Sequence, residues 1–405
     1  MLEEIPLTGR KSNIWKLYLF KILHGFFISI PIIVLFWQEN GLSMFQVMIL
    51  QALFAVSVIA LEVPSGYFAD RYGRRKSLVL ASVFATLGMT GYSLGHGFLG
   101  FLAAEILWAV GVSLVSGADS AMFYDTLVEI GEEDRYKEMW GKASSYYMFS
   151  AAGAAVLGGF LADINLRLTF FAQIPFFAAM IPLAYSLKEP EHHREVGDRE
   201  KETMKTVVKD VFRRPKLRNL IMYGAFIYAA LQTAFWFYQP YFKLTGLDIA
   251  SFGLIYACFN IVSATSSNYA HRIEGKLGKT ASLSLLFVLI TASLLLMSNL
   301  ILKISFIFIG LQQFVRGFSK PVMSDYVNKI VKSDNRSTIL STQSLLGRVF
   351  QALGMPVFGL LADIYTVPQT LTVLAATIFG AGTVLITLLY VQEVVEFAVP
   401  DLKLG

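Results

Sequence analysis

The sequence has few of the residues that soluble or disulfide-stabilised proteins depend on. Charged residues make up 16% of the 405 positions, whereas a soluble chain carries about 25%. A single cysteine, Cys258, excludes a disulfide framework and a cysteine metal site. The five histidines show no metal-binding spacing, so neither a metal nor another cofactor is expected. No Walker loop and no nucleophile–base constellation is found, which argues against ATP coupling and against an enzyme.

Apolar residues dominate instead, at 55% of the chain with 33 phenylalanines. A helix rises about 1.5 Å per residue, so about 20 apolar residues cross the roughly 30 Å hydrocarbon core of a bilayer. Open sheet edges are not tolerated in lipid, so an all-α integral membrane protein is predicted. The run after the polar N-terminus is too long for a signal peptide. Twelve spans are expected, near 14–38, 44–68, 77–96, 98–127, 139–163, 167–187, 217–241, 249–271, 280–298, 301–328, 337–363 and 368–390.

Lysine and arginine indicate the orientation, because cytoplasmic loops carry most of these residues. With both termini in the cytoplasm, most of the 34 basic residues fall on the inner side, and the outer loops hold Arg167, Lys243 and Lys303. A multi-pass protein of the cell membrane is therefore expected. The basic residues lie in short loops between spans, so the net charge of +5 does not indicate nucleic-acid binding.

The chain reads as two repeats joined by a polar segment. The segment Gly159–Ile164 recurs as Gly359–Ile364, two hundred positions later, and Asp125 matches Asp325 at the same offset. Such matches indicate parallel repeats related by an axis along the membrane normal. We expect a six-helix bundle over 1–187, a cytoplasmic linker over 188–216 and a second six-helix bundle over 217–405. Apolar positions at helical spacing within 201–214 predict an amphipathic helix on the membrane surface in the linker.

A short basic loop joins the second and third expected spans. It reads GYFADRYGRRK over residues 66–76, with two glycines that permit a tight turn. This loop resembles the signature loop of the major facilitator superfamily, and all fixed positions of that pattern are present in order. The resemblance covers essentially the whole chain and implies twelve helices in two six-helix repeats around a central cavity. The second half carries a degraded copy of the loop over 272–279, without the acid that matches Asp70.

The resemblance implies a conformational latch at the cytoplasmic ends of the helices. The loop bases would meet the acid that ends the fourth helix, and Asp70 would face the positive N-terminal end of the eleventh helix. Such contacts would hold the cytoplasmic side closed; ordinary surface salt bridges are the alternative. The expected latch residues are Gly66, Asp70, Arg71, Gly73, Arg74, Arg75, Asp125 and Asp325.

Three acids within spans are candidates for proton coupling, because a charge in the membrane needs a partner or a water-filled cavity. Glu62 lies about 12 Å deeper than Asp70 along the same helix, just before Pro64. Some drug-efflux members of the superfamily are similar in carrying an acid there. Asp119 lies at comparable depth on the fourth helix. Many proton-coupled members carry an arginine in the fourth helix where Glu105 stands here. A structural acid bonded to a neighbouring helix is the alternative reading.

Several polar and aromatic side chains are candidates for lining a substrate cavity. Arg316 and Arg348 lie at least about 15 Å from the cytoplasmic ends of their helices. We expect them to neutralise Glu105 or Asp119 across the cavity or to bind an anionic substrate, with Arg316 facing the cavity and Arg348 bracing the second half. Aromatic residues of the seventh helix suit an amphipathic solute, or else an interfacial belt. The full set of cavity candidates is His24, Gln232, Trp236, Asn260, Gln312, Arg316 and Arg348.

These patterns predict a secondary transporter that works by alternating access, similar to drug/proton antiporters of bacteria. The expected function is proton-coupled efflux of small amphipathic organic molecules. Uptake or exchange of a metabolite, anionic if the deep arginines bind it, and lipid flipping on the same fold are the alternatives. The expected partners are a small-molecule substrate, protons and the lipid bilayer. We expect a monomer that does not bind nucleic acid.

Overall fold

The computed structural model describes residues 7–190, 211–331 and 336–398. Regular structure in these ranges is helical throughout, with no strand. In the same ranges, nine helices or joined helical segments are long and apolar enough to cross a membrane, by length and composition. The all-α membrane fold is confirmed, and the number of twelve helices stays a prediction. The amphipathic helix predicted for 201–214 falls largely outside the described residues.

The chain divides into two compact units, and the first comprises Met1–Val196 with Asp248–Ala257. In this unit, α4 packs against α5 and α8, and α3 packs against α5. Gly88 and Gly91 of α4 lie directly against the backbone or Cβ of Ala104 on α5, which lets these two helices approach closely. The helices are α1 (Leu7–Gly25), α2 (Ile33–Glu39), α3 (Met44–Tyr72), α4 (Arg74–Leu94), α5 (Gly97–Val115), α6 (Ala118–Glu129), α7 (Tyr136–Ile164) and α8 (Leu166–Tyr185), with a 3-10 turn at Glu133–Arg135.

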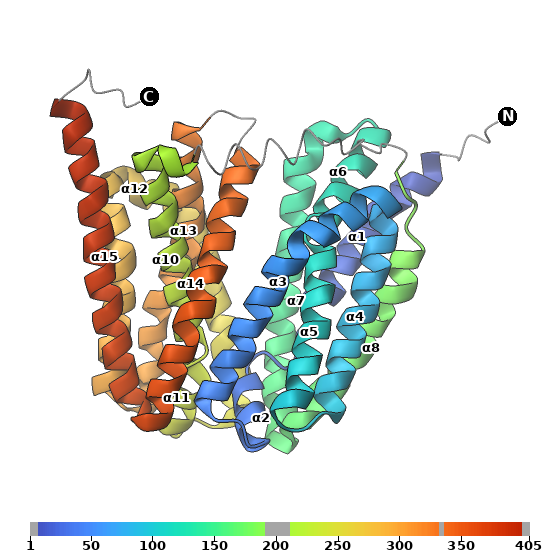
Figure 1. Cartoon of the computed structure of the whole chain (residues 1–405). Helices are drawn as coiled ribbons and strands as arrows, with labels where there is room; N and C mark the ends of the chain where they lie inside the picture. The colour runs from blue at the N-terminus through green and yellow to red at the C-terminus, as the bar shows by residue number, and fades with distance from the viewer. Residues whose placement is uncertain (1–6, 191–210, 332–335, 399–405) are drawn as a thin grey trace. The chain divides into compact units, whose positions relative to one another are not determined.

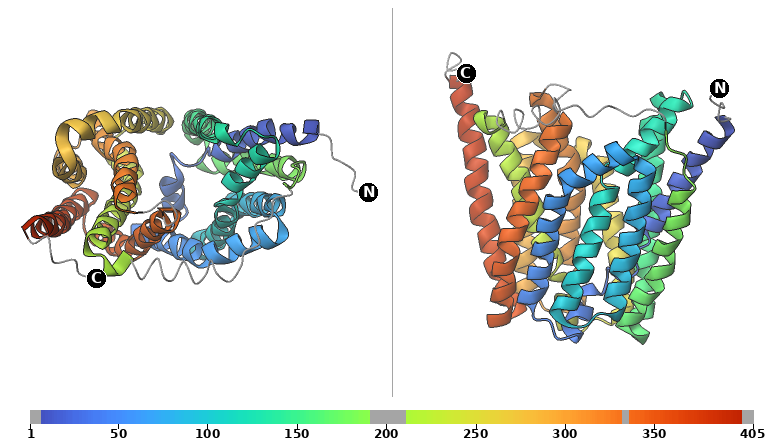
Figure 2. Two further views of the ribbon diagram at one scale, coloured as in Figure 1. Left: turned by 90° about the horizontal axis from the view of Figure 1, so that it is seen from above. Right: turned by 45° about the vertical axis from the view of Figure 1, so that its right-hand side comes forward.

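The second unit comprises Gly197–Leu247 and Cys258–Gly405. Here α10 packs against α13, α14 and α15, and the helices of each unit are seen nearly end-on in the left view of Figure 2. Gly278, at φ 73°, separates two helical arms within α12, which correspond to the expected eighth and ninth spans. The helices are α10 (Pro215–Phe235), α11 (Tyr238–Leu244), α12 (Ile249–Asn299), α13 (Ile309–Ile330), α14 (Arg336–Ile364) and α15 (Val367–Ala398), with a 3-10 turn at Lys303–Phe308.

Three of the expected spans are interrupted, which the sequence reading did not anticipate. The span expected at 14–38 is divided into α1 and α2, the one at 98–127 into α5 and α6, and the one at 217–241 into α10 and α11. Pro31 lies in the first break, where a ring without an N–H disfavours a continuous helix. Gly117 forms the second break at φ 80°, a conformation that glycine adopts without the cost of a side chain.

The backbone groups released at the first break find a partner on another helix. The side-chain amide of Gln173, on α8, accepts a hydrogen bond from the N–H of Ile28 and donates one to the carbonyl of Phe26. Gln173 is fully buried. Within a membrane an unsatisfied backbone group is costly, so these two hydrogen bonds offset part of the cost of the interruption. Interrupted helices mark the binding regions of many transporters, so the residues around these breaks are candidates for a binding site.

Candidate functional site

The signature loop is built around an ion pair within the first unit. Arg74, the first residue of α4, pairs with Asp125 on α6. The same guanidinium donates a hydrogen bond to the carbonyl of Ala121 at 3.0 Å. Both charged side chains are largely shielded, at 16% and 13% exposure. The structure thus brings together Arg74 of the loop and Asp125, the acid at the end of the fourth expected span, as the resemblance implied.

Glu189, which follows α8, completes this loop and was missed by the sequence reading. Its two carboxylate oxygens accept hydrogen bonds from the backbone N–H groups of Arg74 and Arg75, at 2.7 and 2.8 Å. A carboxylate at a helix N-terminus satisfies donors that have no partner in the helix and complements the helix dipole. Gly73 adopts φ 101°, and a Cβ there would lie 2.9 Å from the Glu189 carboxylate. The guanidinium of Arg75 also lies 5.4 Å from the ring of Tyr185 on α8.

The remaining latch candidates are placed at the end of α3 and on α13. Gly66 lies in the last two turns of α3, while Asp70 and Arg71 are exposed in the last turn. Asp325, the expected counterpart of Asp125, forms an ion pair at 2.6 Å with Lys329, one turn on in its own helix. This exposed pair within one helix differs from the largely shielded inter-helix pair of Arg74 and Asp125. The repeat in sequence therefore does not extend to an equivalent ion pair.

A second ion pair lies beside the break between α5 and α6. Asp119 occupies the first turn of α6, two residues after Gly117, and pairs with the ammonium group of Lys21 on α1. The side chains of Lys21 and Asp119 are only 14% and 11% exposed. The sequence analysis offered Arg316 and Arg348 as partners of Glu105 or Asp119, or as ligands of an anionic substrate. In the structure the positive charge beside Asp119 is that of Lys21, within the same unit, and the role of the two arginines stays a prediction.

An aromatic ring lies beside this ion pair and belongs to a group of packed rings. The Lys21 ammonium lies 4.5 Å from the ring centroid of Trp140 on α7, within range of a cation–π interaction. His24, one turn after Lys21, lies with its ring 5.8 Å from that of Tyr147. The rings that pack against one another here, called the aromatic cluster below, are Tyr18, Phe123, Tyr136, Trp140 and Tyr146.

The other two acids differ in their surroundings. Glu105 on α5 is buried, with 3% exposure, and its carboxylate accepts a hydrogen bond from the side-chain amide of Gln51 on α3 at 2.6 Å. Glu62 is half-buried on α3, two residues before Pro64. Of the three acids, Asp119 alone has a cation as its recorded partner in the described part of the chain. Lys21 and Gln51 were missed because neither belongs to a motif.

The cavity candidates of the second unit divide into buried and accessible residues. Gln312 is fully buried and accepts a hydrogen bond from the hydroxyl of Tyr238 at 2.8 Å, while its amide donates to Ser293 at 2.8 Å. Trp236 is also buried. Gln232, Asn260 and Arg348 are half-buried. Arg316 is exposed, with its guanidinium 6.0 Å from the ring of Phe235 on α10.

Known proteins resemble this chain along most of its length. It is 23% identical over 372 residues to YxaM of Bacillus subtilis (strain 168), an uncharacterised MFS-type transporter, covering 88% of this chain and 91% of that protein. It is also 23% identical over 371 residues to multidrug resistance protein 1 of the same organism, covering 89% and 91%. The crystal structure of a mutant of the nucleoside transporter NupG matches with a TM-score of 0.81 at 11% identity, over 94% and 99% of the two chains. At that identity the structural likeness concerns the fold alone.

The sequence profile of one family matches a continuous stretch that includes the signature loop, both ion pairs and most of the interrupted helices. That stretch is residues 18–311, and the family is described as the Major Facilitator Superfamily. YxaM and NupG are described as transporters, in agreement with the expectation that the chain is not an enzyme. The chain belongs to the major facilitator superfamily and is a multi-pass membrane transporter.

Proposed function

We propose that this transporter exports small amphipathic organic molecules in exchange for protons, with Asp119 as the proton-binding group. The observation that carries the proposal is the shielded ion pair of Asp119 with Lys21 at an interrupted helix. Efflux is supported by the likeness to multidrug resistance protein 1 along most of both chains. The plasma membrane of a bacterium is the location we infer from the organism of the relatives.

The ion pair provides a physical route from protonation to a change in structure. Separating two shielded opposite charges is costly, so the pair holds α1 and α6 together while Asp119 is ionised. A proton bound to Asp119 removes its charge and releases Lys21. Because α6 begins directly after the Gly117 break, its first turn can shift without moving the whole of α5. We infer that proton exchange at Asp119 biases the alternating-access cycle.

The surroundings of the pair suit an amphipathic substrate with a basic group. Rings of the aromatic cluster offer flat apolar surfaces, and Trp140 already contacts one ammonium group, that of Lys21. A protonated amine that reaches this cluster would compete with Lys21 for Trp140 and for the Asp119 carboxylate. Competition between substrate and proton for one carboxylate is what antiport requires. His24 stays a further candidate, half-buried one turn from Lys21.

The alternative is uptake or exchange of an anionic metabolite. Its support comes from Arg316, whose side chain is exposed on α13, and from Arg348, for which no acid is recorded as a partner in the described part of its own unit. Lipid flipping on the same fold is the third possibility. The proposals differ in the sign of the substrate charge and in whether a pH gradient drives transport, which a single set of assays separates.

The test uses the full chain in proteoliposomes with an imposed pH gradient. The probes are ethidium as an organic cation, uridine as a nucleoside and a fluorescent lysophospholipid. We expect gradient-driven movement of ethidium that Asp119→Asn abolishes, and ethidium binding that is weaker in this variant and no longer depends on pH. Glu62→Gln and Glu105→Gln are the matched controls, since each also removes one intramembrane carboxylate.

Three outcomes would reject the proposal in distinct ways. Unchanged transport in Asp119→Asn together with its loss in Glu62→Gln would move proton binding to Glu62. Transport of uridine or lysophospholipid alone would replace the substrate class. Equal rates with and without the pH gradient would exclude proton coupling.

A further inference from the structure

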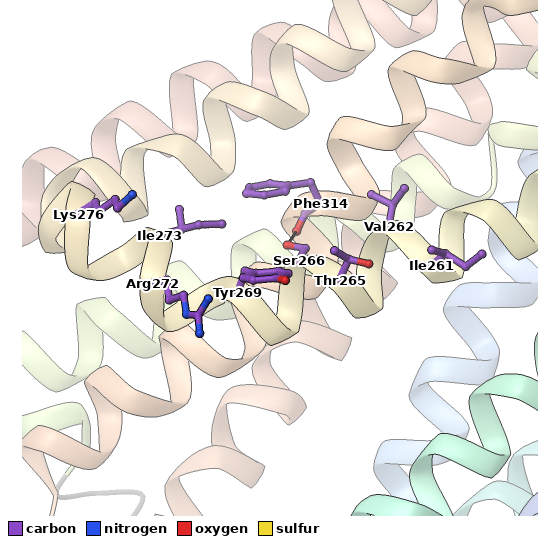
Figure 3. Close-up of a pocket in the computed structure, with 9 residues that line it drawn as sticks. All are labelled: Ile261, Val262, Thr265, Ser266, Tyr269, Arg272, Ile273, Lys276 and Phe314. Carbon is purple, nitrogen blue, oxygen red and sulfur yellow. Dashed lines mark hydrogen bonds between the residues drawn. The ribbon is translucent and has the colours of Figure 1, made fainter.

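A long apolar trough runs along one helix of the second unit, outside the site described above. Its volume is about 540 Å³, and it lies along the first arm of α12 where this arm meets α13. Figure 3 shows Ile261 and Val262 towards one end and Ile273 and Lys276 towards the other, with Phe314 of α13 beside the middle. All of the lining residues belong to the second unit.

The length of the trough matches one leaflet of a bilayer. From Ile261 to Lys276 the helix advances 15 residues, or about 22 Å. Half of the hydrocarbon core measures about 15 Å, and the remainder reaches the headgroup region. Ile261, Thr265, Tyr269 and Ile273 recur every four residues, so they form one stripe along the helix. A single extended hydrocarbon chain fits such a stripe.

The one buried polar side chain in the lining of the trough is already hydrogen-bonded. The hydroxyl of Ser266, which is 5% exposed, donates a hydrogen bond to the carbonyl of Phe314 at 2.7 Å. This bond joins α12 to α13 and uses up the one buried polar side chain of the lining. By contrast, Ile261 is 64% exposed and Tyr269 is 49% exposed. The trough is thus an exposed apolar surface in a membrane-spanning region.

Positive charge is confined to one end. Arg272 and Lys276 line that end, lie one turn apart and are both exposed. The guanidinium of Arg272 lies 5.5 Å from the ring of Tyr269, which holds it above the apolar stripe. The acid of this turn, Glu274, accepts a hydrogen bond from the hydroxyl of Tyr326 on α13 at 2.8 Å. The end of the trough next to the Gly278 kink therefore presents two cations.

We propose that this trough is a binding site for an anionic phospholipid of the surrounding bilayer. One acyl chain lies along the stripe from Ile273 towards Ile261, and the phosphate is held by Arg272 and Lys276. Charge complementarity selects this occupant, because a zwitterionic or neutral lipid leaves the two cations without a net counter-charge. The site is distinct from the Lys21–Asp119 pair, which lies in the other unit.

The test measures lipid retention by the purified full chain. Native mass spectrometry counts the phosphatidylglycerol and phosphatidylcholine molecules bound from mixed micelles. We expect phosphatidylglycerol to be retained preferentially, and the double variant Arg272→Gln/Lys276→Gln to weaken its binding by about 10–30-fold. The control is Lys243→Gln/Lys303→Gln, which removes two exposed cations from elsewhere in the same unit.

A phosphatidylglycerol with a photoreactive acyl chain locates the site independently. We expect cross-links on peptides within 261–276 of the unmodified protein, and their loss in Val262→Trp, which fills the trough. Equal weakening by the two double variants, equal retention of phosphatidylcholine, or cross-links spread evenly over the chain would overturn the proposal. Displacement of the lipid by a transported anion would assign the trough to substrate instead, and would likewise reject it.

Discussion

At the scale of single residues, Glu189 shows how one carboxylate organises a loop that already holds several charges. It binds the first two N–H groups of α4, next to the ion pair of Arg74 with Asp125. We predict that Glu189→Gln lowers the unfolding free energy by about 1 kcal/mol, because an amide offers one acceptor and no charge to the helix N-terminus. Thermal unfolding of the purified protein measures the loss.

The control for this prediction is Glu133→Gln, which removes an exposed acid from the nearby 3-10 turn. Its unfolding midpoint should stay close to that of the parent. If both variants unfold at the same temperature as the parent, the two hydrogen bonds of Glu189 contribute nothing to stability. If both fall equally, general surface charge rather than capping is responsible.

At the scale of helices, the breaks decide where function is placed. Gly117 permits α6 to begin anew, and its backbone at φ 80° is strained for any residue with a Cβ. No heavy atom would lie within 4 Å of a Cβ at this position, so the cost of alanine is purely conformational. We predict that Gly117→Ala lowers the unfolding free energy by about 1–2 kcal/mol and slows transport, because it opposes the break before Asp119.

Gly153 on α7 provides the matched control. It also has open space around the position of a Cβ, but its backbone is helical. Gly153→Ala should therefore be neutral or stabilising, by up to about 1 kcal/mol. Chemical denaturation of both variants, followed by ethidium transport, tests the pair. A stable Gly117→Ala protein with full transport would show that the break has no role.

At the scale of the whole molecule, the latch implied by the signature loop stays a prediction. We expect Asp70→Asn to weaken the state in which the cytoplasmic side is closed, since an anion is lost from the predicted contact with the eleventh helix. Spin labels are placed at Tyr72 on α3 and Ser341 on α14, in a chain with Cys258 replaced by serine. They report the distance between the cytoplasmic ends of these two helices. The distribution should shift to longer distances.

Asp163→Asn is the control, because that acid ends α7 and lies outside the signature loop. It should leave the distance distribution unchanged. An Asp70→Asn protein that is no more open than the parent would remove Asp70 from the latch. In that case the Arg74–Asp125 pair would be a structural bond within the first unit, as its shielding also permits.

The sequence by itself determined the class of the protein and the chemistry of its loops. Apolar runs of membrane length, the matches at an offset of two hundred, and the pattern over 66–76 each depend on residues close together in the chain. Such local patterns predict helices and the family, because a helix is set by periodicity within one segment. The charged candidates Asp119 and Arg74 were also found from local sequence, because a charged residue in or beside an apolar run can be identified without knowing the tertiary structure.

Only the tertiary structure decided which side chains meet. Lys21 reaches Asp119 across 98 positions, Glu189 reaches Arg74 across 115, and Gln173 reaches Phe26 across 147. Each pair is formed when helices pack, and no spacing in the sequence encodes such a contact. The breaks were not predicted although Pro31 and Gly117 stand in two of them, because each apolar run of membrane length was interpreted as one continuous helix. The structure thus assigned Asp119 the partner Lys21, where charge balance alone had suggested an arginine of the other half.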